Sequence, residues 1–156
     1  MFRGFATISF YADDLAAARD WYTALLGFPP YFMFPQPPVA PGYLEFRVGD
    51  DGDELGIIDR RYAPAGAATT PGGAVMFWHV DDLEATVARL LAMGATEYQP
   101  ITAQGANGEF VTAAVVDPFG NVLGVMHNPH YLEVQAARRG QAPPPPAPPA
   151  GGPVSG

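Results

Sequence analysis

The chain alternates short strand-like segments with two longer segments that have helical spacing. Residues 5–11 alternate apolar side chains with hydroxylated ones, which is the period of a strand buried on one face. From Leu15 to Leu26 apolar residues recur every three or four positions, which predicts an amphipathic helix. Gly27 suits the left-handed end of that helix, and the two prolines that follow prevent its continuation.

This plan occurs twice along the chain. Asp13-Asp14-Leu15 opens the first helix after residues 5–11, and Asp81-Asp82-Leu83 opens a second after residues 74–80, at an offset of 68 residues. Three further strands are predicted after each helix, at residues 31–34, 43–48 and 54–59, and at residues 96–101, 110–116 and 122–126. The sequence therefore predicts an α+β fold of two tandem βαβββ modules, with any ligand site between them.

Composition divides the chain into five segments. The first module is expected at residues 1–61, a linker rich in Ala, Pro, Gly and Thr at 62–73, and the second module at 74–128. Residues 129–140 form an extension with a short helix expected at 131–139. Residues 141–156 carry no charge and contain seven of the 18 prolines, so we expect an extended, polyproline-like or disordered tail without a partner.

One turn is predicted in detail. Asp117-Pro118-Phe119-Gly120 separates two strand segments of the second module. Asp first, Pro second and Gly fourth suit a type I turn followed by a left-handed residue.

Charge and cysteine content exclude several kinds of chemistry. The chain has no cysteine, and its eight basic residues are all arginine, against 16 acidic residues and a net charge of −8. Disulfides, thiolate metal sites and a Schiff-base lysine are thus excluded, and nucleic-acid binding is disfavoured because it needs a basic surface. No apolar run approaches the roughly 18 residues of a membrane span. We expect a soluble, cytoplasmic protein whose acidic field either favours cationic small molecules or only maintains solubility.

The combined motifs resemble the vicinal oxygen chelate superfamily, which includes glyoxalase I, extradiol dioxygenases, fosfomycin-modifying enzymes and bleomycin resistance proteins. The resemblance covers about residues 5–128. It rests on three motifs: a helix with Trp21-Tyr22 ending in residues 25–28, residues 80–83 with 91–95, and residues 117–125. It implies two βαβββ modules whose sheets curl around a shared cleft, with the helices on the convex side. It also implies a homodimer.

The resemblance further implies four positions at which metal-dependent members place ligands. The motifs align these positions with Thr7, Ile58 (to within about two residues), Val75 and Gly124. Three of the four have no donor side chain, and a divalent ion needs several protein ligands to bind firmly. We therefore expect no metal and no cofactor. The three histidines, His79, His127 and His130, are expected to be structural or exposed.

Strand parity predicts which side chains face the cleft. Together with the aligned positions, the predicted lining is Thr7, Ser9, Tyr11, Tyr43, Glu45, Arg47, Ile58, Val75, Phe77, His79, Gly124 and Met126. Apolar and aromatic groups with a few polar ones are typical of small-molecule pockets. Glu45 and Arg47 are alternatively a solvated ion-paired face, Tyr43 and Phe77 core residues, and His79 a structural hydrogen-bonding group or an acid–base group.

These features favour one function and leave two others open. The first is a metal-free small-molecule binding protein of the glyoxalase/bleomycin resistance type, which sequesters a cationic or aromatic compound such as an antibiotic. The alternative is a lyase, isomerase or dioxygenase-like enzyme that uses the same cleft. A third hypothesis is a partner-binding module that makes contact through its proline-rich tail.

Overall fold

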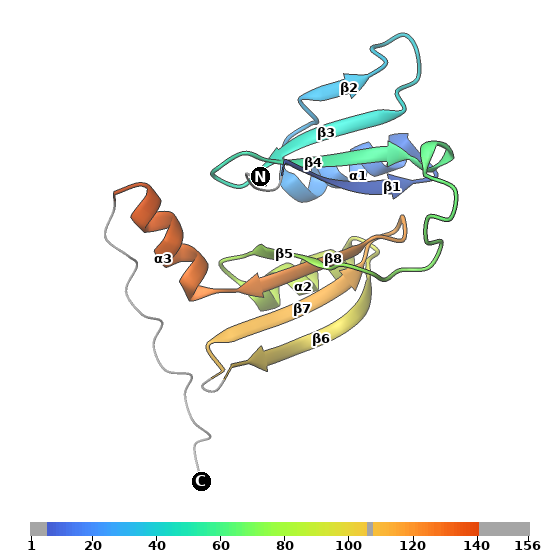
Figure 1. Cartoon of the computed structure of the whole chain (residues 1–156). Helices are drawn as coiled ribbons and strands as arrows, with labels where there is room; N and C mark the ends of the chain where they lie inside the picture. Colours follow the sequence, from blue (N-terminus) through green and yellow to red (C-terminus); the bar gives the residue numbers. More distant parts are fainter. Residues whose placement is uncertain (1–5, 106–107, 141–156) are drawn as a thin grey trace.

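The computed structural model describes residues 6–105 and 108–140, and the tail at 141–156 lies outside them. Figure 1 shows two halves with the same order of elements. The first half contains β1 (Thr7–Ala12), α1 (Leu15–Leu26), β2 (Phe32–Phe34), β3 (Tyr43–Val48) and β4 (Asp53–Asp59). The second contains β5 (Met76–His79), α2 (Leu83–Ala92), β6 (Thr96–Gln104), β7 (Phe110–Val116) and β8 (Val122–His127). The short helix η1 (Arg60–Tyr62) follows β4, and α3 (Pro129–Arg138) follows β8. The predicted pair of βαβββ modules is confirmed.

Each module is a four-stranded mixed sheet in which the first strand occupies an edge. The strand orders are β1-β4-β3-β2 and β5-β8-β7-β6. β1 runs parallel to β4 and β5 parallel to β8, whereas the other neighbours are antiparallel. Ser9 pairs with Gly56, and Phe77 pairs with Gly124. Because both residues of the second pair lie 68 positions after those of the first, the repeat extends to strand register.

Aspartates start both helices as the repeat predicted. The Asp14 side chain accepts a hydrogen bond from the backbone N–H of Ala17 at 2.9 Å, and Asp82 does the same for Ala85 at 2.9 Å. Each bond satisfies a donor that has no partner within its helix. Gly27 ends α1 with φ of 86°, a conformation that costs glycine little.

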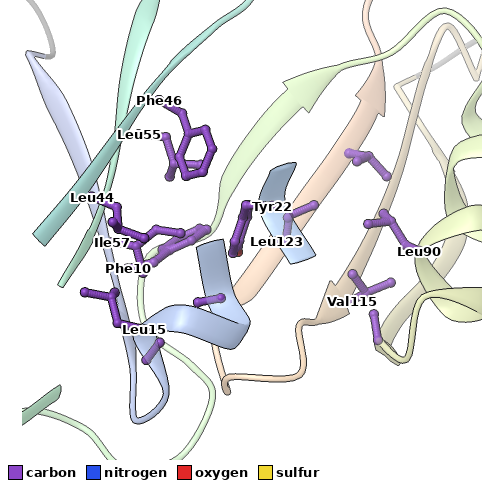
Figure 2. Packing of buried hydrophobic residues seen from close by; sticks show 14 of the residues in the cluster. Phe10, Leu15, Tyr22, Leu44, Phe46, Leu55, Ile57, Leu90, Val115 and Leu123 are labelled. Atoms are coloured by element: carbon purple, nitrogen blue, oxygen red, sulfur yellow. The ribbon is translucent and has the colours of Figure 1, made fainter. Parts of the chain in front are cut away.

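The two modules share one continuous hydrophobic core. Tyr22 of α1 is fully buried, and its ring lies 6.2 Å from Phe46 of its own module and 6.4 Å from Phe119 of the other. Figure 2 shows Tyr22 between the side chains of the first sheet and those around Leu90 and Val115. In each module these side chains are buried between the sheet and its helix. The opposite face of each sheet is left for a site.

The turn between β7 and β8 joins the modules through polar groups. Gly120 has φ of 91° and donates its N–H to the carbonyl of Asp117 at 3.1 Å, which confirms the predicted turn. The Asp117 carboxylate is 3% exposed and accepts the Tyr22 hydroxyl at 2.6 Å. The Asn121 amide accepts from the backbone N–H of Tyr11 and donates to its carbonyl, both at 3.0 Å. Asn121 thereby binds both backbone groups of Tyr11 on the edge strand β1, as a residue of a neighbouring strand would.

The C-terminal helix α3 returns from the second module to the first. It begins at Pro129, two residues earlier than expected, because proline suits the first turn of a helix and Asn128 caps it. Its Gln135 amide donates to Asp51 at 3.0 Å, and Arg139 pairs with Asp50 at 3.1 Å. Both aspartates lie in the turn between β3 and β4, so α3 ends beside the first sheet. Within the described ranges no helix is long and apolar enough to cross a membrane.

Candidate functional site

One face of the first sheet carries most of the predicted site. The opposite face holds Leu44, Phe46, Leu55 and Ile57, which are buried in the core. The residues between them in each strand therefore share the free face. We call this set the polar face: Thr7, Ser9 and Tyr11 from β1; Phe32 and Phe34 from β2; Tyr43, Glu45 and Arg47 from β3; and Glu54, Gly56 and Ile58 from β4.

Glu45 lies at the centre of the polar face. It is only 9% exposed, and its two carboxylate oxygens accept separate hydrogen bonds from the hydroxyls of Tyr31 and Tyr43, the second at 2.7 Å. Burial alone would raise the pKa of Glu45, but the hydrogen bonds with Tyr31 and Tyr43, an interaction with the Glu54 side chain and nearby Arg47 reverse this and leave the pKa below its usual value. Glu45 is therefore a fixed carboxylate at neutral pH.

The tyrosines remain protonated donors. The hydrogen bond to Glu45 raises the pKa of Tyr31, with burial adding to the effect. For Tyr43 burial is the main cause of a raised pKa, and its bond to Glu45 is the second. The Tyr31–Glu45–Tyr43 cluster thus holds one negative charge and two protons in a fixed arrangement.

A second polar cluster lies beside Glu45. Arg47 pairs with Glu54 at 2.9 Å, and Thr7 donates its hydroxyl to the same carboxylate at 2.7 Å. The guanidinium carbon of Arg47 also lies 4.7 Å from the ring centre of Tyr31. Arg47 therefore has its carboxylate partner, Glu54, within the polar face. The alternative that Glu45 and Arg47 form an ion-paired face thus fits Arg47, which pairs with Glu54. Glu45 accepts hydrogen bonds from two tyrosines instead.

Gly56 allows Tyr43 to lie across the polar face. A Cβ atom at Gly56 would lie 2.8 Å from the Tyr43 ring and 2.8 Å from its hydroxyl oxygen. Real Cβ atoms do not approach so closely, so any larger residue would displace Tyr43 from Glu45. Sequence reasoning missed Gly56, Glu54 and Tyr31. The 68-residue offset from Gly56 to Gly124 was a usable signal for the glycine.

A cavity of about 670 Å³ opens at the β1 edge of the polar face. It is lined by residues 8–11 of β1, Arg60, linker residues between Ala67 and Met76, and residues 120–122. We call this the junction cavity, because both modules contribute to it. Of the predicted lining it contains Ser9, Tyr11 and Val75. Its arginine is already neutralised, since Arg60 pairs with Asp13 at 3.1 Å and donates to the Phe119 carbonyl at 2.7 Å.

The second sheet presents a different, largely apolar face. This face carries Phe77, Gly124 and Met126. Phe77 of β5 pairs with Gly124 of β8, and His79 pairs with Met126 two residues further along the same two strands. The Phe77 ring covers Gly124, where a Cβ atom would lie 2.7 Å from the ring and 2.9 Å from the Met76 carbonyl oxygen. The Phe77 ring of the neighbouring strand β5 therefore occupies the space that a side chain at the aligned position Gly124 would fill.

A family model matches residues 4–125, which is most of the chain. The chain belongs to the Glyoxalase/Bleomycin resistance protein/Dioxygenase superfamily. No curated protein matches the sequence. The fold is similar to that of a protein from Agrobacterium tumefaciens, with 24% identity, TM-score 0.64, and coverage of 81% of this chain and 98% of that one.

Other solved structures share the architecture. A glyoxalase-related enzyme from Fulvimarina pelagi is 21% identical, with TM-score 0.63 and coverage of 82% of this chain and 90% of the other. A glyoxalase/bleomycin resistance protein from Catenulispora acidiphila is 25% identical, with TM-score 0.53 and coverage of 79% and 96%. These likenesses establish the fold and leave the ligand to be inferred from the site.

The four positions aligned with metal ligands differ in side-chain chemistry. Two of them also lie at different register positions of the β1–β4 pair, since Thr7 pairs with Glu54, whereas Ile58 pairs with Tyr11. Val75 precedes β5 and lines the junction cavity. Within the part of the chain that the structure describes, no three His, Asp or Glu side chains are grouped as metal ligands.

His79 lies under the C-terminal helix of this superfamily member. Its ring stacks on Tyr131 at 5.2 Å and lies 5.6 Å from the ring of His127. Its Nδ1 accepts the backbone N–H of Asn128 at 3.1 Å, and its Nε2 is buried without a partner. Burial lowers the pKa of His79, the His127 charge lowers it further, and Asp81 partly opposes the change. These contacts favour the structural reading of His79.

The lowered pKa of His79 predicts a pH-dependent stability. Because the unfolded state binds a proton at His79 more readily, the stabilisation is present above the ordinary value of 6.5 and is lost as pH falls through the lower folded pKa. Urea unfolding between about pH 7 and pH 5 should show the free energy of unfolding falling with acidification. His79→Asn, which keeps an acceptor for Asn128 and does not titrate, should flatten this dependence. His130→Asn is the matched control, because His130 is exposed and pairs with the likewise exposed Glu133 at 3.5 Å. Equal pH slopes in wild type and His79→Asn would contradict the assignment.

Proposed function

We propose that this protein binds a cationic small organic molecule with a planar ring on the polar face of its first sheet. The observation that carries the proposal is the buried Glu45 carboxylate, which two tyrosine hydroxyls hold in its charged form. Around it the rings of Tyr31, Phe32 and Phe34 are 51%, 40% and 63% exposed. Exposed aromatic rings beside a fixed negative charge favour a cation through both electrostatic and cation–π attraction.

The junction cavity supports a ligand larger than a simple ammonium ion. Its volume of about 670 Å³ lies in the range of small-molecule sites. Ser9 faces this cavity and pairs with Gly56, which in turn pairs with Glu45. Because the Tyr43 ring covers Gly56, a ligand with its charge near Glu45 would extend past this ring to place an apolar part in the cavity beside Ser9.

The electrostatics of the polar face favour binding over acid–base catalysis. A general acid or base is most effective when its pKa lies near the working pH. Here the pKa of Glu45 is lowered while those of Tyr31 and Tyr43 are raised, so all three move away from neutrality. The alternative, a lyase, isomerase or dioxygenase-like enzyme, draws less support from these residues.

Glu45→Gln is expected to weaken binding of a cationic aromatic probe. Acriflavine titrated into the purified protein should quench tryptophan and tyrosine emission, and the variant should need about tenfold more probe, since a charged contact contributes about 1.5 kcal/mol or more. Glu84→Gln is the matched control, because it removes the same charge from an exposed position on α2. Equal affinity of the two variants, with circular dichroism unchanged, would contradict the role of Glu45.

Metal-free binding has its own test. After incubation with Fe(II), Mn(II), Ni(II) and Zn(II) and desalting, the protein should retain less than about a tenth of an equivalent by mass spectrometry, because tight sites need several donors. Near one equivalent of any ion would overturn the metal-free proposal and direct attention to the enzyme alternative.

A cytoplasmic homodimer also remains part of the proposal, and light scattering tests the dimer.

A further inference from the structure

An unusual aromatic surface lies at the outer edge of the first sheet. Tyr31, Phe32 and Phe34 are 51%, 40% and 63% exposed, and β2 is the last strand of its sheet. The Phe32 ring lies 6.4 Å from Tyr31 and 6.3 Å from Tyr43, so the rings form one surface, which we call the aromatic strip. Grouped exposed aromatic residues on a soluble domain mark a place where something binds.

The C-terminal helix delivers the chain to the sheet that carries this strip. Arg139 pairs with Asp50 at 3.1 Å and lies 3.7 Å from Asp51, and Gln135 also binds Asp51 at 3.0 Å. These aspartates lie in the turn where β3 ends. The chain beyond Gly140 therefore starts beside the first sheet, although α3 follows the last strand of the second.

The chemistry of the remaining chain matches the aromatic strip. Residues 141–156 contain seven prolines, of which six fall within 143–149, and no charged residue. Proline-rich segments bind aromatic-lined surfaces because their rings pack on tyrosine and phenylalanine and little conformational entropy is lost. An uncharged segment does not satisfy Glu45, so it fits the strip of rings and leaves the carboxylate available to a cation.

The length of the chain is sufficient. The six residues of β3 separate the turn from Tyr43 by about 20 Å at 3.3 Å per residue. The nine residues 141–149 in an extended proline-type conformation span about 28 Å at 3.1 Å each. Tyr43 pairs with Phe34, so the prolines at 143–149 reach the strip without any change in α3.

We propose that the proline-rich segment of residues 141–156 packs on the aromatic strip of its own chain and competes there with a bound ligand. The packing depends only on the strip and the tether formed by Arg139 and Gln135. The competition rests on the proposed function, because it requires the ligand to use the polar face.

Packing is tested without any ligand by comparing the backbone amide resonances of two full-length proteins. The second replaces the prolines of the segment by serine: Pro143, Pro144, Pro145, Pro146, Pro148 and Pro149. The expected result is a set of shift differences at Tyr31, Phe32, Phe34 and Tyr43, with the second sheet unchanged. The differences should not depend on protein concentration. Phe34→Ala in the natural chain should reproduce part of them.

Two outcomes would overturn the packing. The first is identical strip resonances in the two proteins. The second is strip resonances that change with protein concentration and not with the prolines, which would assign the strip to a second copy of the chain.

Competition is measured separately by titrating both proteins with acriflavine, and the serine variant should bind about three- to tenfold more tightly. Equal affinities would overturn the competition while the resonances still report the packing. If neither protein binds acriflavine although the resonances differ, the proposed function fails and the packing stands.

Discussion

Asp117→Ala is expected to lower the free energy of unfolding by about 4 kcal/mol, because it leaves buried donors without an acceptor. The Asp117 carboxylate accepts the Tyr22 hydroxyl at 2.6 Å, the Phe119 N–H at 2.9 Å and the Asn121 N–H at 2.8 Å. It also accepts the Asn121 side-chain amide at 2.9 Å. Tyr22 is itself fully buried, so water cannot replace the lost acceptor. Urea unfolding followed by circular dichroism measures the change.

Tyr22→Phe provides the matched comparison. It removes one donor and keeps the ring, so Asp117 retains its backbone partners and the expected cost is about 1–2 kcal/mol. The double variant should cost less than the sum of the single ones, because the two groups share one hydrogen bond. A loss below about 1 kcal/mol for Asp117→Ala would show that the turn does not hold the modules together.

Gly124→Ala is expected to destabilise the protein by about 2 kcal/mol through overpacking. The new Cβ atom would lie 2.7 Å from the Phe77 ring and 2.9 Å from the Met76 carbonyl oxygen. The ring can rotate away, but the carbonyl belongs to the backbone of the neighbouring strand. One of the two sheet strands must therefore shift, and thermal unfolding should report the loss.

The repeat supplies the comparison for this substitution. For Gly56→Ala the three nearest atoms all belong to the Tyr43 side chain, so the substitution should cost less stability, about 1 kcal/mol, while detaching Tyr43 from Glu45. Gly72→Ala meets no atom within 4 Å and should leave stability nearly unchanged. If Gly124→Ala behaved like Gly72→Ala, the close packing of Phe77 over β8 would be wrong.

The sequence predicted most strongly those elements that bury one face. The segment Tyr43–Val48 was predicted with its observed bounds, because its alternation records a core face and a free face. β6 was expected to end at Ile101 but continues to Gln104. Its residues are largely exposed on both faces, so burial leaves no alternation to read. The helix of the extension was expected only from residue 131, although Asn128 and Pro129 already begin α3.

Strand parity predicted which side chains share a face of the sheet, but it could not predict which of them contact one another. Glu45 and Tyr43 were both expected at the site, yet their hydrogen bond depends on a ring crossing over Gly56. Tyr31 was expected inside the strand at residues 31–34, whereas β2 begins at Phe32, so the contact of Tyr31 with Glu45 arises from the loop before β2, which strand periodicity does not specify. The partnership of Thr7 with Glu54 follows from the parallel register of β1 and β4, which no local pattern specifies.

The polar groups of the turn before β8 also constrain the order in which the chain can complete its fold. All strands of the first sheet have been synthesised once Asp59 is added. The acceptor of the Tyr22 hydroxyl nevertheless lies 95 residues beyond Tyr22, and the amide partner of β1 at Tyr11 lies 110 residues beyond Tyr11, so both are synthesised later. A nascent first module on the ribosome therefore carries an open strand edge, which other chains can pair with. During synthesis of residues 60–121, Tyr11 on this edge therefore lacks the amide partner that it has in the complete fold.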